Sequence, residues 1–163
     1  MKVAFIVPKD DDRHSPLSQF AQCRVLPPVG LARMAGLAGK RGSVVVVDER
    51  IASAKHQRHA QIAVIFVNSY NSFRAHELAR QYKQYGSHVV FTGPKLMQSP
   101  DETERAERYA DSLFMGSAED NMPIFLSDFI AGKAKRFYHE SANKTNQSRN
   151  PFIDDDVNWS LAS

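Results

Sequence analysis

Cysteine is almost absent from this sequence: Cys23 is the single example among 163 residues. One thiol cannot form a disulfide within the chain. It also cannot supply the several ligands that a multi-cysteine metal site or an iron–sulfur cluster requires. We therefore expect neither a disulfide framework nor an iron–sulfur cluster in this chain.

Long hydrophobic runs are also missing. No apolar stretch approaches the roughly 20 residues with which a helix crosses a bilayer. The apolar segment after Met1, Lys2–Pro8 (KVAFIVP), is too short for the core of a signal peptide and is not followed by a cleavage site. These absences predict a soluble, cytoplasmic protein with no membrane-spanning segment.

Positive charge is present but not concentrated. Lys and Arg number 21 against 18 Asp and Glu, a formal net charge of +3, and no long basic run occurs. A nucleic-acid partner is therefore not expected. Phosphate-binding loops are missing as well, because the loop after the first apolar run (PKDDDRHSPLSQF) has no glycine and no G-x-x-x-x-G-K-[ST] motif occurs.

Short apolar runs separated by helical patterns are the main feature that is present. The runs have the length and continuous apolar character of strands that are buried on both faces: Val3–Val7, Val44–Val47, Ile62–Val67, Val89–Phe91 and Leu113–Met115. Their alternation with helices predicts an α/β fold with an open, doubly wound sheet of five parallel strands. Arg136–His139 is a candidate for a sixth strand at an edge. Residues 1–140 would form this domain, and residues 141–163 a polar linker with an apolar-ended tail.

The loops at the carboxyl ends of the strands are where such a sheet binds ligands. Right-handed crossovers would bring four of them to one edge: Lys9–His14, Asn68–Ser72, Thr92–Lys95 and Gly116–Glu119. These loops contain no nucleophile–base pair, no metal-binding cluster and no cofactor lysine, and acids at loop tips such as Asp10–Asp12 are usually solvated. We therefore expect no catalytic residue, no metal site and no catalysis by this chain alone.

The segment Pro27–Asp48 has the pattern P-P-x-G-L-x-x-x-A-x-x-x-x-x-x-G followed by a strand that ends in Val-Asp. This pattern resembles the amino-terminal domain of cobalamin-dependent radical-SAM enzymes, a version of the flavodoxin-like cobalamin-binding fold. The matching residues are Pro27, Pro28, Gly30, Leu31, Ala35, Gly42, Val47 and Asp48. Thr92-Gly93-Pro94 is similar to the family's G-G-P, and Gly116-Ser117-Ala118-Glu119 to its G-E-G-E. The resemblance covers about residues 1–140.

The sequence also departs from that family. The radical-SAM barrel and its three-cysteine motif are missing, so radical chemistry by this chain is excluded. The cobalamin motif D-x-H-x-x-G is matched only at its start, by Asp12-Arg13-His14, because Leu17 stands where the glycine should be. Thr92 replaces the first glycine of G-G, which adds a β-branched side chain where the corrin's nucleotide tail would approach the backbone.

The resemblance implies a stand-alone domain that binds a corrinoid, or presents it to a separate enzyme with a radical-SAM barrel. His14 would be the lower ligand of cobalt. The groove would be lined by Ser69, Tyr70, Asn71, Thr92, Gly93, Pro94, Gly116 and Ser117. A second hypothesis is a degenerate domain without cofactor that acts by protein–protein contact, its groove filled by Tyr70, Phe73 and Lys95. A third is a fragment, because the tail NPFIDDDVNWSLAS resembles the passage into the family's barrel.

The tail is apolar at its end. Phe152, Ile153, Val157, Trp159 and Leu161 lie within ten residues. Exposing all of them would leave an apolar patch that soluble monomers seldom tolerate. We expect this segment to dock on its own domain or on a second copy, which would give a homodimer.

Overall fold

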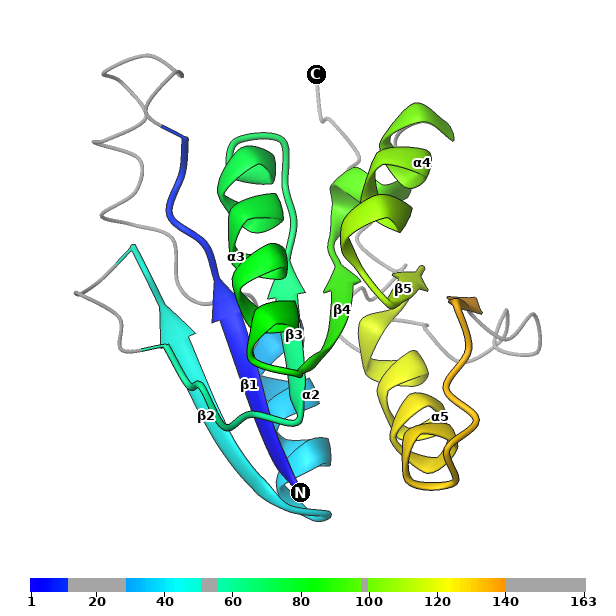
Figure 1. Cartoon of the computed structure of the whole chain (residues 1–163). Helices are drawn as coiled ribbons and strands as arrows, with labels where there is room; N and C mark the ends of the chain where they lie inside the picture. The colour runs from blue at the N-terminus through cyan, green and yellow to red at the C-terminus, as the bar shows by residue number, and fades with distance from the viewer. Residues whose placement is uncertain (12–28, 51–55, 98–99, 140–163) are drawn as a thin grey trace, which may run out of the picture.

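The computed structural model describes residues 1–11, 29–50, 56–97 and 100–139. They form an α/β structure around a sheet of six parallel strands in the order β2-β1-β3-β4-β5-β6 (Figure 1). The strands are β1 (Lys2–Val7), β2 (Ser43–Asp48), β3 (Ile62–Phe66), β4 (His88–Thr92), β5 (Ser112–Met115) and β6 (Phe137–His139). The helices are α2 (Val29–Gly39), α3 (Ser72–Gln84), η1 (Pro94–Met97), α4 (Pro100–Tyr109) and α5 (Ala118–Ile130).

The predicted fold is confirmed. Every neighbouring pair of strands is parallel, and the candidate sixth strand pairs with β5 at the edge. The order β2-β1-β3-β4-β5 is that of flavodoxin-like sheets. His14 and the tail, residues 141–163, lie outside the described residues, so the predictions made for them stay predictions.

Both faces of the sheet are covered by helices, as the apolar strands require. On β1, Val3, Phe5 and Val7 belong to a buried cluster with α2 and α5. Ala4 and Ile6, which alternate with them, belong to a second cluster with α3 and α4. The alternation of side chains along each strand therefore gives the molecule two separate apolar cores, one on each face.

The connection from β5 to β6 differs in hand from the others. In Figure 1, α3 lies in front of the sheet and the chain steps to the right from β3 to β4, which is the usual right-handed crossover. The step from β5 to β6 goes in the same direction, yet α5 packs on the opposite face, in the cluster that contains α2. This crossover is therefore left-handed, the rare hand for a connection between parallel strands.

The packing of α5 explains the reversed hand. Its buried residues Met122, Phe125 and Leu126 share a core with Phe5 and Phe114, and α5 contacts α2 directly. The other face already carries α3 and α4, which contact each other. Placing α5 beside α2 buries apolar strand residues that α2 alone would leave uncovered.

Candidate functional site

The carboxyl ends of β1, β3, β4 and β5 lie at one edge of the sheet, because the strands are parallel. The chain leaves β1 toward α2 on one face and leaves β3 toward α3 on the other. This divergence between neighbouring strands is the topological switch point at which open α/β sheets bind ligands. We call this region, the loops after these four strands, the carboxyl edge.

The loop after β3 is a compact turn held by two asparagines. Asn68 Oδ1 accepts the backbone N–H groups of Tyr70 (2.7 Å) and Asn71 (3.0 Å). Asn71 is fully buried, where its Oδ1 accepts the Asn68 N–H (2.9 Å) and its Nδ2 donates to Phe66 O (3.2 Å). Ser69 and Tyr70 are exposed at the tip. Of the three predicted groove residues in this loop, Asn71 holds the turn and the other two lie at the surface.

The loop after β1 is tied to the loop after β3. The Asp11 N–H donates to Tyr70 O (2.7 Å). The Asp11 carboxylate accepts the backbone N–H groups of Phe73 (3.1 Å) and Arg74 (3.0 Å) in the first turn of α3. A carboxylate there satisfies free helix N–H groups and complements the helix dipole. Asp11 is therefore a capping residue, and the expectation that the acids of this loop are merely solvated is wrong for it.

The ends of β4 and β5 both turn through a glycine with positive φ. Gly93 has φ +134°, and a Cβ there would lie 2.2 Å from Val67 O, so no larger residue fits without a backbone shift. Thr92, just before it, is buried, and its carbonyl accepts the Val67 N–H (2.7 Å). Gly116 has φ +100°. Ser117 follows it and caps α5, its Oγ accepting the Asp120 N–H (3.3 Å).

The structure thus brings most of the predicted site residues to one edge. Those that lie at the carboxyl edge in the described part of the chain are Ser69, Tyr70, Asn71, Thr92, Gly93, Pro94, Gly116 and Ser117. Pro94 is exposed and begins η1, whereas Thr92 and Asn71 point into the protein. The exposed part of the edge is accordingly made of a short loop tip and two glycine turns.

A buried polar network flanks this edge, and sequence analysis did not identify it. The Glu49 side chain, only 7% exposed, accepts hydrogen bonds from Arg74 Nη2 (2.7 Å) and Nε (3.0 Å). It also accepts the Lys9 N–H (3.2 Å) and lies 3.0 Å from His56 Nε2. Burial raises the pKa of Glu49, but these bonds, above all those from Arg74, outweigh it and hold the pKa below its ordinary value. The network joins the ends of β1 and β2 to α3.

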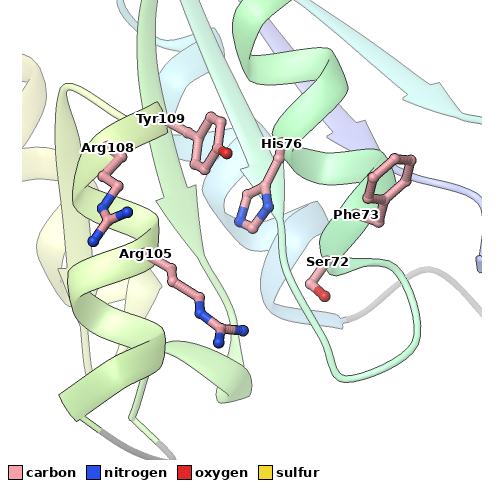
Figure 2. A pocket seen from close by; sticks show the side chains of 6 residues that line it. All are labelled: Ser72, Phe73, His76, Arg105, Arg108 and Tyr109. Carbon is pink, nitrogen blue, oxygen red and sulfur yellow. The ribbon is translucent and has the colours of Figure 1, made fainter.

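A concave region lies between α3 and α4, and it begins at Ser72, the last residue of the edge loop after β3. It has a volume of about 310 Å³ and is lined by Ser72, Phe73, His76, Arg105, Arg108 and Tyr109 (Figure 2). We call it the α3–α4 pocket. No spacing motif in the sequence indicates it, because its two halves lie on helices about 30 residues apart that meet only in the fold.

Comparison with protein-family models and with curated proteins gives no match for this chain. Among the described residues, no group of three or more His, Cys, Asp or Glu side chains could hold a metal ion. None of the helices in the described part of the chain is both long and apolar enough to cross a membrane.

Proposed function

We propose that this chain is a non-catalytic domain that binds a corrinoid at the carboxyl edge and holds or presents it to a separate enzyme. The observation that carries the proposal is the pair of positive-φ glycine turns, Gly93 and Gly116, at the ends of neighbouring strands. Neither turn carries a side chain; at Gly93 the Cβ direction is filled by the backbone of Val67, so the turn presents only backbone at the edge. A flat, bulky ligand can therefore lie close to the ends of β4 and β5.

A buried acceptor lies beneath one of these turns. Asn121 Nδ2 donates to Met115 O (3.4 Å) and Tyr138 O (3.0 Å), which fixes the orientation of the amide. Its Oδ1 is buried and has no hydrogen-bond partner within the described residues. An unsatisfied buried acceptor is rare and costly. Because the oxygen is shielded from the surface, a ligand that rests on the edge would not reach it directly.

The interior below the edge limits how deeply such a ligand could enter. Phe114, Phe125 and Tyr138 pack edge to face, with ring centroids 5.4 to 5.7 Å apart. Thr92 is buried on the same face of the sheet, and the strand register puts it level with Phe114 and Tyr138. The proposed ligand therefore rests on the rim, with its tail reaching no deeper than the level of Thr92.

The rival hypothesis of a degenerate interaction module requires the groove to be filled by the protein's own side chains. Tyr70 is 55% exposed and Phe73 47% exposed, so neither fills the edge. Lys95 instead donates to Ser72 Oγ (3.2 Å) on the α3 side. This arrangement favours ligand binding over a self-filled groove.

Retention of hydroxocobalamin tests the proposal. The protein is incubated with the corrinoid and desalted, and its visible spectrum is recorded. We expect the corrinoid to stay bound. Ser69→Trp, which places bulk over the edge from an exposed loop, should abolish retention. Ser43→Trp, at an exposed position on the amino end of β2, is the matched control and should retain it.

The proposal fails if the unmodified protein emerges colourless, or if both tryptophan variants lose the corrinoid equally. His14, the proposed lower ligand of cobalt, gives a further readout. If it ligates, His14→Ala should change the visible spectrum of the retained corrinoid without removing it.

A further inference from the structure

The α3–α4 pocket combines cationic and hydroxyl donors on one of its sides. Figure 2 shows the Arg105 guanidinium directed from α4 toward Ser72 and His76 on α3. Lys95 Nζ donates a hydrogen bond to Ser72 Oγ (3.2 Å). Because the Ser72 oxygen accepts that bond, its own hydroxyl hydrogen is available to a ligand. These donors are suited to an anion.

Nearby acids hold the two arginines only weakly, whereas Lys95 lies 3.5 Å from Glu102 and both of those side chains are largely buried. Arg105 lies 3.7 Å from Glu102 and Arg108 2.9 Å from Glu104, and both arginine side chains are mostly exposed. Exposed arginine pairs contribute little stability, so a phosphate that binds here competes mainly with Glu102, which pairs with both Arg105 and Lys95. Arg is also the side chain whose planar donors best match phosphate oxygens.

The rest of the pocket is aromatic. His76 stacks on Tyr109 with ring centroids 4.2 Å apart and planes 12° from parallel. Phe73, 47% exposed, lines the pocket on the α3 side. Within the described residues neither ring nitrogen of His76 forms a hydrogen bond, and burial lowers the pKa of His76, which keeps the imidazole neutral near pH 7. A neutral imidazole offers one donor and one acceptor.

We propose that the α3–α4 pocket binds a small phosphorylated ligand with one heteroaromatic base, of the nucleoside monophosphate class. Arg105, Ser72 and Lys95 bind the phosphate. The ring packs against Phe73, and His76 forms a hydrogen bond with a polar group of the ligand. The volume of about 310 Å³ lies at the small end of the usual range for ligand sites, which suits a mononucleotide better than a dinucleotide. This site adjoins the carboxyl edge through Ser72 and Lys95, but the proposal does not depend on corrinoid binding.

Isothermal titration calorimetry with adenosine 5′-monophosphate, in the absence of corrinoid, tests this assignment. We expect binding in the micromolar-to-millimolar range, with adenosine alone and inorganic phosphate alone each binding more weakly. Arg105→Ala should weaken binding about tenfold, the effect of losing one charge-assisted hydrogen bond. Phe73→Ala should weaken it by about the same factor through lost stacking. Both side chains are exposed enough for the variants to fold.

Arg33→Ala is the matched control. Arg33 is 68% exposed and paired with Glu119, as Arg105 is 65% exposed and paired with Glu102, but it lies on α2 at the other face. It should leave binding unchanged. Arg105→Ala should also leave hydroxocobalamin retention unchanged. The assignment is overturned if the mononucleotide does not bind at millimolar concentration, if inorganic phosphate binds as tightly, or if Arg33→Ala weakens binding as much as Arg105→Ala.

Discussion

Gly93 and Gly36 illustrate at the scale of single residues how differently two glycines respond to an added methyl group. Gly93→Ala should lower the free energy of unfolding by about 2 kcal/mol or more, because the residue has φ +134° and its Cβ would lie 2.2 Å from Val67 O. Gly36→Ala, in α2, places a Cβ with no atom within 4 Å. It should raise the free energy of unfolding by about 0.5 to 1 kcal/mol.

Urea unfolding of the two variants and the unmodified protein measures both effects. A Gly93→Ala variant as stable as the parent would show that the turn after β4 does not have the close approach described for it.

Single residues also show the limit of prediction from sequence at the candidate site. The loops that meet at the carboxyl edge could be predicted, because parallel strands place their carboxyl ends together. The direction in which each side chain faces could not be predicted. Asn71 and Tyr70 are neighbours, yet one is buried and the other exposed, and this depends on hydrogen bonds inside the turn. The capping role of Asp11 depends on a contact with α3, about 60 residues away in the sequence.

At the scale of elements, the strands were predictable because buried parallel strands appear as continuous apolar runs. Glycines that follow α3 and α5, Gly86 and Gly132, have positive φ and mark the ends of those helices as the sequence indicates. The hand of the β5-to-β6 connection was not predictable, because it depends on which face still lacks cover once α2, α3 and α4 are in place. No local sequence pattern in α5 indicates which face of the sheet the helix will cover.

The last strand, β6, is held by a few specific contacts. Tyr138 is buried. Its hydroxyl donates a hydrogen bond to Asp128 Oδ2 (3.1 Å) and accepts one from the Lys135 N–H (2.8 Å). Tyr138→Phe keeps the ring and removes both bonds, so the free energy of unfolding should fall by about 1 kcal/mol. Backbone amides of β6 should then exchange hydrogen faster. The exchange rates of amides in β1 and β3, in the centre of the sheet, should change only as much as the loss of global stability requires.

Hydrogen exchange followed by NMR resolves the two regions separately. If the amides of all strands exchange faster by the same factor, and by more than the loss of global stability explains, Tyr138 does not have a local role at β6. Phe137→Tyr, on the same strand but with its side chain on the α3–α4 face, is a control that should leave the exchange of β6 nearly unchanged.

At the scale of the whole molecule, buried histidines should make stability depend on pH. Burial lowers the pKa of His76 and of His88 below the ordinary value of 6.5. Ser112 Oγ donates its hydrogen to Lys135 O (2.6 Å), so it is the acceptor for His88 Nε2–H (2.9 Å). The neutral imidazole already supplies that N–H, so His88 needs no added proton to form the bond. The unfolded chain therefore binds protons at higher pH than the folded one, and stability falls as pH drops below about 6.5.

Urea unfolding at about pH 7.5 and about pH 5.5 should give a smaller free energy of unfolding at the lower pH. His88→Gln, which keeps a donor for Ser112 Oγ but cannot be protonated, should reduce that difference. Carboxylates with lowered pKa, such as Glu49, lose their contribution only below their ordinary value of 4.5, so they do not act in this range. Equal stability at both pH values would contradict the prediction.

The uniform direction of the six strands has a practical consequence for attaching this chain to anything else. Met1 precedes β1 at the amino edge, where its carbonyl accepts the Ser43 N–H (2.9 Å). His139, the last described residue, ends β6 at the carboxyl edge (Figure 1). A tether joined directly after His139 would start beside the rim on which a ligand is proposed to rest, whereas one joined to Met1 would start at the opposite edge. An immobilised or fused form that must keep its ligand edge open should be anchored through its amino terminus.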